Sequence, residues 1–288
     1  MRFQYFQPQS LQDVFSLLGQ HLPGAKVMAG GTDLLVAMKM EKLSVPTVIG
    51  LSKVSELAGV AHDAPSKSLR IGALATHHEV SSSPIVLERF AHLAHAASVV
   101  GSRQVRNVGT VVGNICNASP SAETAPALLT LDAMVNISGP NGVRQVAIAD
   151  FFTAPGKTVL AGNEIVTDLT VPEPGPNAFG TYIKLSRRRA MDLAIVGVAA
   201  LLVVADGVCQ KVRISLGAVA PTPVRVPEAE AILLGQVVND KLIEAAGQAA
   251  MEACRPISDV RASAEYRRDM VGVLVQRAIR QSLAKAGN

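Results

Sequence analysis

Two glycine-centred stretches, far apart along the chain, decide the fold. The first runs KVMAGGTDLL over residues 26–35, and the second runs RNVGTVVGN over residues 106–114 and continues into NASP at residues 117–120. Glycine adopts positive φ readily and has no Cβ to block a ligand, so each stretch can close tightly around an anion. Successive N–H groups in such turns form a concave site for phosphate oxygens. Two such loops on an apolar scaffold suit a diphosphate better than a monophosphate.

Composition limits the classes of function. The chain has 288 residues, of which 49% are hydrophobic and 17% charged, so it can bury a large core and is expected to form two or three globular domains. Its net charge is +4, and the longest basic run, Arg187–Arg189, has no interleaved aromatic residues. The sequence also lacks tryptophan. Nucleic-acid binding therefore has little support.

The apolar segments and the cysteines narrow the classes further. The most apolar stretch, Leu193–Ala205, is shorter than the roughly 20 residues of a membrane-spanning helix. The N-terminus has no apolar signal region, so we expect a cytoplasmic protein without a membrane span. Cys116, Cys209 and Cys254 fit neither a disulfide framework nor a metal-ligand spacing. Because iron–sulfur clusters require four thiolates, we expect no cluster and no other metal on this chain.

The first fifty residues or so predict a small α/β unit in which the glycine turn joins a strand to a helix N-terminus, a place that favours anions. Its expected elements are a helix over residues 11–22 capped at Ser10, a strand over Lys26–Ala29, a helix from Thr32 to about Met40, and a strand over Val48–Leu51.

The middle of the chain predicts alternating short elements. They are a strand over Leu69–Ala73, a capping box at Thr76, a helix from Ser83-Pro84 to about Val99, a helix near Ala122–Leu131, a hairpin turn at Asn141-Gly142 and a strand over Ile165–Val171.

Three prolines between Pro172 and Pro176 mark the clearest boundary, because proline continues neither a helix nor a central strand. Beyond it we expect strands, then helices, which makes the chain α+β throughout. The expected elements are strands over Ala178–Leu185, Asp192–Ala205 and Val208–Ala218, a tight turn at Asp206-Gly207, helical structure over about the last sixty residues, and a final helix near Ala262–Ala284.

The sequence contains neither of the two common nucleotide-binding motifs and no recognisable hydrolytic site. No G-x-G-x-x-G run follows a strand, as a Rossmann site requires. Gly156-Lys157-Thr158 resembles the end of a P-loop, but the position that needs the first glycine holds Phe151. No Ser/His/Asp or Cys/His arrangement stands out, so we assign no catalytic residue to this chain.

Several candidate residues also have a purely structural interpretation. Each glycine loop alone could be a buried turn, although the two together favour a binding role. Glu123 could serve a helix start or accept hydrogen bonds from a ligand hydroxyl. Tyr182 and Lys184 share one face of a predicted strand and could be a half-buried tyrosine beside a solvated lysine.

Two further clusters have weaker functional interpretations. His77 and His78 are adjacent, so they diverge on a helix and make a poor metal pair; a capped helix start accounts for them better. Arg187–Arg189 is typical of a solvated loop, and its functional alternative is a contact with an anion or a partner near the site.

The motifs, taken in order, resemble one family nearly from end to end: the FAD-binding medium subunits of molybdenum hydroxylases. This is the group of carbon monoxide dehydrogenase, nicotine dehydrogenase and the flavin domain of xanthine dehydrogenase. The matching segments are AGGTDL at residues 29–34, IGA at 71–73, RNVGT at 106–110, GN at 113–114, SP at 119–120 with Glu123 and Pro126, GKT at 156–158 and RRAMDLA at 188–194.

The resemblance implies a fold with two parts. A two-subdomain FAD-binding domain of the vanillyl-alcohol oxidase type would occupy residues 1–175, with subdomains at about 1–55 and 56–175. A small α+β C-terminal domain would occupy residues 176–288.

The resemblance also implies the residues that bind FAD. The two glycine loops would hold the pyrophosphate, Ser119 and Glu123 would reach the ribose and adenosine, Ile165 would pack on the cofactor, and Lys184 would approach the isoalloxazine ring. A cation there suits the negative charge of the reduced ring. The full set is Lys26, Val27, Met28, Ala29, Gly30, Gly31, Thr32, Asp33, Leu34, Ala73, Thr76, Val108, Gly109, Thr110, Gly113, Asn114, Cys116, Ser119, Glu123, Ile165, Tyr182, Lys184 and Asp192.

The chain departs from the family pattern at two positions. Val112 stands where a second glycine is usual, and Glu123 stands where Asp is usual. We interpret both as tolerated variants. The cysteine-bearing insertion of the hydroxybenzoyl-CoA reductase branch is missing, which argues against an extra iron–sulfur centre.

The function implied by the resemblance is that of an electron-transfer flavoprotein subunit. A large partner subunit would carry the molybdenum cofactor, and a small partner subunit would carry [2Fe–2S] clusters that pass electrons to FAD and then to an external acceptor. Two alternatives remain. A free-standing flavin oxidoreductase would show substrate-dependent bleaching of the isolated chain, and a scaffold or nucleotide-binding protein without redox activity would bind no flavin.

Overall fold

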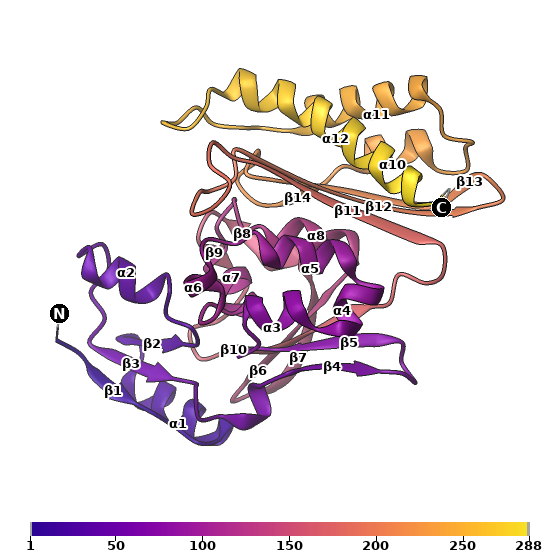
Figure 1. The fold of residues 1–288 in the computed structure, drawn as a ribbon. Coiled ribbons are helices and arrows are strands. Elements are labelled where there is room, and N and C mark those ends of the chain that lie inside the picture. Colours follow the sequence, from indigo (N-terminus) through magenta and orange to yellow (C-terminus); the bar gives the residue numbers. More distant parts are fainter. Residues whose placement is uncertain (1, 287–288) are drawn as a thin grey trace.

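The structure is a computed structural model that describes residues 2–286. Figure 1 shows most of the molecule as stacked layers, with the N-terminal unit beside them. The C-terminal helices cover one face of an antiparallel sheet, a layer of shorter helices lies against its other face, and a second antiparallel sheet closes the stack.

The N-terminal unit is a small parallel sheet with the order β1-β3-β2. The helix α1 buries Val14 and Leu18, and Ser10 caps it by accepting a hydrogen bond from the Asp13 N–H at 3.2 Å. The elements are β1 (Gln4–Phe6), α1 (Leu11–His21), β2 (Ala25–Met28), α2 (Leu34–Lys39) and β3 (Thr47–Gly50), followed by a 3₁₀ turn at Ser55–Leu57.

The second sheet is antiparallel, with the order β4-β5-β10-β6-β7, so β10 returns from far along the chain to pair between β5 and β6. A bulge lies between Val166 and Asp168 on β10. The strands are β4 (Val60–Asp63), β5 (Ser68–Gly72), β6 (Met134–Gly139), β7 (Gly142–Ala147) and β10 (Ile165–Pro172), with a separate small hairpin formed by β8 (Phe152–Ala154) and β9 (Lys157–Thr158).

Short helices form the layer between the two larger sheets (Figure 1). The predicted capping box at Thr76 is confirmed: the Thr76 hydroxyl accepts from the Glu79 N–H at 3.1 Å, and the Thr76 N–H donates to the Glu79 carboxylate at 2.7 Å. The helices are α3 (His77–Ser82), α4 (Pro84–Arg89), α5 (Ala91–Ser98), α6 (Arg103–Arg106), α7 (Val111–Asn117), α8 (Thr124–Thr130) and α9 (Ile148–Phe151).

The C-terminal part is an antiparallel sheet covered by helices. Asp206 and Gly207 both have positive φ, of 52° and 75°, and join two long strands as the predicted tight turn. This pair of positive φ values matches the right-handed twist of a two-residue hairpin. The elements are β11 (Ala178–Leu185), β12 (Val196–Ala205), β13 (Val208–Gly217), β14 (Val224–Arg225), α10 (Pro227–Leu233), α11 (Asp240–Ala253) and α12 (Ala264–Ala286).

Strand β12 contributes to two cores because successive side chains point to opposite faces. Ala199 and Leu201 join the core of the preceding domain, whereas Val198, Ala200 and Leu202 join the core beneath α10–α12. The strand therefore reads as a continuous apolar run, which is expected when a strand is buried on both faces.

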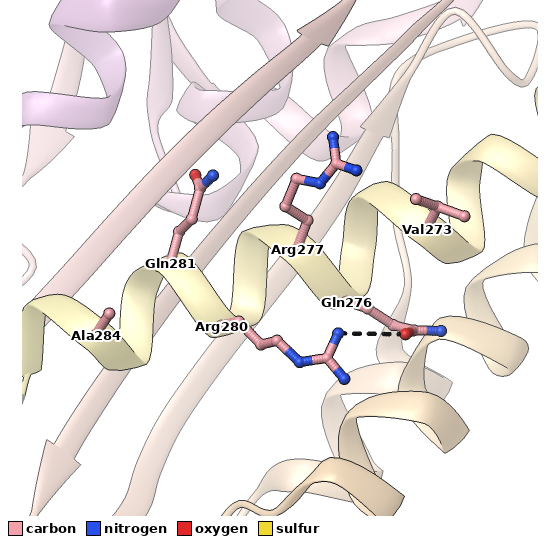
Figure 2. Close-up of a pocket in the computed structure, with 6 residues that line it drawn as sticks. All are labelled: Val273, Gln276, Arg277, Arg280, Gln281 and Ala284. Carbon is pink, nitrogen blue, oxygen red and sulfur yellow. Dashed lines mark hydrogen bonds between the residues drawn. The ribbon is translucent and has the colours of Figure 1, made fainter.

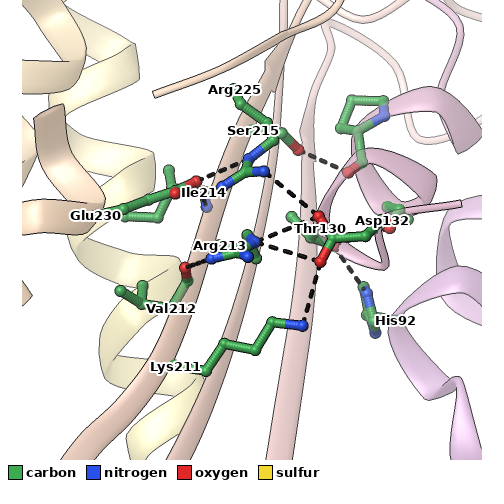
Figure 3. A network of polar contacts seen from close by, with 12 residues as sticks. His92, Thr130, Asp132, Lys211, Val212, Arg213, Ile214, Ser215, Arg225 and Glu230 are labelled. Atoms are coloured by element: carbon green, nitrogen blue, oxygen red, sulfur yellow. Dashed lines mark hydrogen bonds and ion pairs between the residues drawn. The ribbon is translucent and has the colours of Figure 1, made fainter. Parts of the chain in front are cut away.

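A polar network also joins the two parts of the chain (Figure 3). The Asp132 carboxylate follows α8 and receives Lys211 at 3.1 Å, Arg213 at 3.3 Å and Arg225 at 3.3 Å from β13 and β14. Arg225 is shared with Glu230, which also accepts from the Ile214 N–H at 2.9 Å.

Two predicted helices differ from the structure. Thr32 does not cap α2: the helix begins later, and its N-cap residue, Asp33, makes no side-chain cap hydrogen bond. The helix expected from Ser83-Pro84 to Val99 breaks at Phe90, whose φ of −130° and ψ of 38° leave the helical range. Phe90 is fully buried, so core packing overrides helical continuity at this residue.

Two predicted strand features also shift. The strand expected to begin at Asp192 begins at Val196, because the Asp192 backbone carbonyl is held by Lys184 and its carboxylate by the Arg188 N–H. The hairpin turn near Asn141-Gly142 is centred one residue earlier, since Gly142 pairs with Gly139 as the first residue of β7. Among residues 2–286, no helix is both long and apolar enough to cross a membrane.

Candidate cofactor site

The two glycine loops meet in the structure. A Cβ added to Gly30 would collide with the Val108 carbonyl group and would lie 2.9 Å from the Gly109 Cα. Only glycine lets the two backbones approach this closely. The first loop of the N-terminal unit is thus seated on the second loop, and the two loops predicted to share one ligand are brought together.

The first loop presents free backbone donors. Within the described chain, the N–H groups from Gly30 to Asp33 donate to no backbone or side-chain acceptor. Gly31 has a φ of 70°, the left-handed conformation that turns successive N–H groups toward one side. Free donors on a loop that packs this closely against the second glycine loop fit the diphosphate of a dinucleotide.

The second loop uses most of its donors internally. Asn107 and Gly109 donate backward to carbonyls of α6, and the Gly113 N–H donates to the Thr110 hydroxyl at 3.0 Å, which caps α7. The loop is also pinned from outside, because the His77 N–H donates to the Gly109 carbonyl at 3.0 Å and the Val111 N–H donates to the Ala75 carbonyl at 3.1 Å. The second loop therefore forms a rigid surface and has few backbone N–H groups left for a ligand.

Lys184 lies at the junction of the two domains and is fully paired. Its ammonium group donates to the Val99 carbonyl at 3.0 Å, the Glu123 carboxylate at 2.8 Å and the Asp192 carbonyl at 2.8 Å. An ammonium has three N–H donors, so none remains for a ligand. The alternative of a solvated lysine is wrong, since only 9% of this side chain is exposed.

The Lys184–Glu123 contact also bears on how the cofactor residues are assigned. The resemblance places Glu123 toward the adenosine and Lys184 toward the isoalloxazine ring, yet the two side chains form one buried ion pair. They cannot flank opposite ends of an extended dinucleotide. Burial raises the pKa of Glu123, and the Lys184 ammonium opposes this rise.

Tyr182 and Asp192 lie next to this pair. Tyr182 is buried, its hydroxyl has no hydrogen-bond partner in the described chain, and burial together with the Glu123 charge raises its pKa far above the ordinary value. The Asp192 carboxylate accepts from the Arg188 N–H at 3.0 Å, which lowers its pKa. Both residues belong to the same cluster as Lys184.

Several of the other predicted residues are buried or hydrogen-bonded within the protein, and the rest lie on the loops or at the ends of helices and strands. Ala73 and Ile165 are buried in the apolar core, and burial raises the pKa of the Cys116 thiol to about 12, so this thiol is unreactive. Asn114 accepts from the Thr124 hydroxyl at 2.9 Å, and the Ser119 hydroxyl pairs with that of Ser121. The remaining predicted residues outside the paragraphs above are Lys26, Val27, Met28 and Ala29 on or after β2, Leu34 at the start of α2, Thr76 at the start of α3, and Val108 at the exposed surface of the second loop.

His77 was not among the predicted site residues, although it lies against the second loop. Its side chain is 2% exposed, and its pKa is lowered to about 4 by burial and by the Arg106 charge. The sequence offered only a capping box and a pair of adjacent histidines here, and neither signals that the ring of His77 is buried beside Gly109.

A surface groove of the described chain lies away from these residues. Figure 2 shows it along α12, where it has a volume of about 410 Å³ and is lined by Val273, Gln276, Arg277, Arg280, Gln281 and Ala284. None of these residues belongs to the predicted cofactor site. They lie on the helical cover of the C-terminal sheet (Figure 1).

The fold and the paired loops define a class of protein: an FAD-binding domain followed by a flavoprotein C-terminal domain. A family model described as the FAD binding domain in molybdopterin dehydrogenase matches residues 1–174, and one described as the CO dehydrogenase flavoprotein C-terminal domain matches residues 181–282. The chain belongs to this family of FAD-binding oxidoreductase subunits, which confirms the resemblance and the expected fold class.

Similar proteins match along almost the whole chain. The chain is 34% identical to a putative xanthine dehydrogenase FAD-binding subunit of Escherichia coli K12, covering 98% of this chain and 97% of that one. It is 33% identical to the carbon monoxide dehydrogenase medium chain of Hydrogenophaga pseudoflava, covering 99% and 98%. A solved structure of the latter enzyme, lacking the Mo-pyranopterin moiety of its molybdenum cofactor, superposes with a TM-score of 0.95 over 99% of this chain and 98% of that chain.

Proposed function

We propose that this chain is the FAD-carrying electron-transfer subunit of a molybdenum-dependent hydroxylase. A large partner would hold the molybdenum cofactor, and a small partner would hold [2Fe–2S] clusters that supply electrons to the flavin. An external acceptor would then remove them. Relatives named as medium chains or FAD-binding subunits, which match this chain over nearly its full length, support the subunit role.

The observation that carries the proposal is the contact between the two glycine loops. Free N–H donors at Gly30–Asp33 lie on a loop that can pack against the second loop only because Gly30 has no Cβ to collide with Val108 and Gly109. Such donors bind phosphate oxygens without any side-chain charge. FAD, when bound, supplies reversible acceptance of two electrons and their release singly or together.

The residues of this chain would bind and orient the cofactor. The first loop would hold the diphosphate through its N–H groups, and the second loop would fix the position of the first through Val108 and Gly109. The Lys184 ammonium, with its donors already paired, would act on the ring through its charge and through the loop that it holds at Asp192. Glu123 would keep that ammonium in place.

We also propose that the chain divides into the units implied by the sequence. An FAD-binding domain would span residues 1–175, with subdomains at about 1–55 and 56–175, and a C-terminal domain would span 176–288. The parallel sheet ends at Gly50, the central antiparallel sheet spans Val60 to Pro172, and the C-terminal sheet begins at Ala178, which supports these divisions.

Purification of the intact species from its native host under mild conditions tests the proposal, with a visible spectrum and metal analysis as readouts. Flavin bands together with iron, molybdenum and two co-purifying chains would support the electron-transfer subunit. Flavin without metals or partners would instead indicate a free-standing oxidoreductase. A colourless chain that also refuses added FAD would mean that the glycine loops are only turns.

A further inference from the structure

The arginine run of the sequence lies on a loop that the rest of the protein holds in place. Arg187–Arg189 follow β11, and all three side chains are exposed. The Arg188 N–H donates to the Asp192 carboxylate at 3.0 Å, and the Met191 N–H donates to the Gly101 carbonyl at 3.1 Å. A loop that is only solvated is usually mobile, whereas these contacts fix one shape.

A second loop lies beside the first, at the end of the C-terminal sheet where α12 begins (Figure 1). The Arg187 guanidinium donates to the Val260 carbonyl of this second loop at 3.4 Å. The buried Arg267 also joins the two loops, because it donates to the Ile195 carbonyl at 2.7 Å and to the Asp259 carboxylate at 2.7 Å. The two loops therefore form one continuous surface.

This surface combines positive charge with exposed apolar side chains. We call residues 187–193 and 255–261 the arginine–apolar patch; they contain five arginines and two aspartates, and arginines of the same chain pair with both aspartates. The patch also holds four of the fourteen large apolar side chains that are exposed in the described chain, although it is a small part of that chain. These four are Met191, Leu193, Ile257 and Val260.

Such a composition is typical of a surface that another protein covers. Contiguous exposed apolar side chains mark interaction sites, and arginine and methionine are enriched in protein interfaces. The surplus of positive charge is complementary to a partner that presents carboxylates. Because the loops are already held in one shape, a partner would bind them without first ordering them.

We propose that the arginine–apolar patch is the docking surface for a partner subunit of the complex, which would meet it with carboxylate-bearing and apolar side chains. The proposal rests on the function proposed above and adds the place at which a partner binds. A permanent subunit fits better than a brief encounter with an electron acceptor, because permanent interfaces are larger and more apolar than transient electron-transfer contacts.

The patch also borders the proposed cofactor site. The Lys184 ammonium, which is buried with Glu123 at the junction of the two domains, donates to the Asp192 carbonyl of the patch at 2.8 Å. Gly101, which accepts from Met191, leads through α6 into the second glycine loop. A subunit bound at the patch would therefore lie against segments that hold the cofactor site.

A photo-crosslinker at Val260 identifies the occupant directly. The substitution Val260→p-benzoylphenylalanine places a reactive group at the most exposed apolar side chain of the patch and keeps the carbonyl that Arg187 contacts. Irradiation of the intact complex from the native host should join this chain to one of the two co-purifying chains. A cross-link to a second copy of this chain or to a soluble acceptor protein, or no cross-link, would overturn the proposal.

Charge variants test the energetic part. Arg189→Glu with Val260→Glu changes two exposed side chains that make none of the contacts holding the loops. This double variant should keep the FAD spectrum and the unfolding temperature of the unaltered chain, yet bind its partner subunits at least about 10-fold more weakly. Gel filtration of the diluted complex measures the partner chains that remain bound.

The matched control is Arg277→Glu with Val237→Glu, which should bind the partner subunits like the unaltered chain. Arg277 is exposed on α12, and Val237 is exposed in a loop beside the start of β13, at the opposite end of β12 from the patch. Equal binding by the patch variant and the control, whether both are tight or both are weak, would refute the assignment to the patch.

The outcomes separate the two proposals. If the unaltered chain binds FAD but co-purifies with no other chain, the proposed subunit function fails, and the docking surface fails with it. If the complex forms and the cross-link goes elsewhere, only the docking surface is wrong. If the double variant does not fold, the cross-link on the otherwise unaltered chain still decides.

Discussion

The two glycine loops are similar in composition and differ in how they are held. From Gly30 to Asp33 the N–H groups of the first loop are free. In the second loop, the N–H groups of Asn107, Gly109 and Gly113 donate to acceptors a few residues earlier in the sequence. The first loop turns through Gly31 at positive φ, while Gly109 is not among the residues with positive φ.

This difference shows that glycine has two separate purposes here. In the first loop, Gly30 permits close backbone approach and Gly31 permits the turn that exposes donors. In the second loop, Gly109 permits close packing against the Val105 carbonyl oxygen and the side chains of Thr32 and His77. The first loop supplies hydrogen-bond donors and the second supplies a rigid surface. Substitutions in the two loops should therefore differ in their effects on FAD binding and on stability.

The largest effect is expected for Gly30→Val. Its side chain would overlap the Val108 carbonyl and the Gly109 Cα, so the loops must separate and FAD binding should be lost, by more than about 100-fold in Kd. The first clash of the new side chain is thus with the second loop and not with a ligand. Gly19→Val, at an exposed position of α1, is the control, since a Cβ there meets nothing within 4 Å. Flavin fluorescence titration measures both, and tight binding by Gly30→Val would refute the contact.

Lys184→Ala should loosen the support of the second loop while sparing the first. It leaves the buried Glu123 carboxylate unpaired and should destabilise the fold by about 3–5 kcal/mol. Because Lys184 also holds the Val99 carbonyl at the end of α5, amide exchange should accelerate around α6 more than around β2. We further expect the flavin potential to change more than FAD retention.

The double variant Lys184→Met with Glu123→Gln is the matched control for Lys184→Ala. Removing both charges should restore much of the stability, since no unpaired carboxylate remains. Chemical denaturation measures this recovery. Equal stability of the single and double variants would show that the ion pair does not support the junction.

Acid should affect the second loop through His77. Its folded-state pKa of about 4 lies below the unfolded value of about 6.5, so the unfolded chain binds more protons as pH falls between these values. Stability is therefore full above pH 6.5 and declines toward pH 4, with His77 contributing about 2 kcal/mol of the loss at pH 5. The buried His92, also near 4, adds a similar slope. Denaturation of the flavin-free chain should show a shallower pH dependence for His77→Phe than for the unaltered chain.

The smallest effect is expected for a pair of threonine variants. Thr110→Val removes the hydroxyl that caps α7 and should cost about 1 kcal/mol of stability, with Thr110→Ser restoring it. Thr32→Val, in the first loop, should leave stability nearly unchanged because Thr32 caps no helix. Thermal unfolding of the flavin-free chain compares them, and equal losses for the two variants would contradict the distinction between the loops.

Much of the fold follows from local patterns. The turn at Asp206-Gly207, the capping box at Thr76 and the long apolar strands are visible because turn chemistry and side-chain period act over a few residues. The break at Phe90 and the late start of β12 at Val196 were missed. Both depend on groups elsewhere in the fold, namely the core around Phe90 and the Lys184 ammonium.

The sequence by itself determined which residues could approach a phosphate closely, because the conformational freedom of Gly30 and Gly31 belongs to glycine wherever it stands. It also determined the α+β class and the family. Only the tertiary structure decided that Gly30 rests on Val108, that Lys184 pairs with Glu123 and that His77 borders Gly109. These contacts join segments far apart in the chain, and their geometry is set by the packing of whole sheets and helices, which no local pattern encodes.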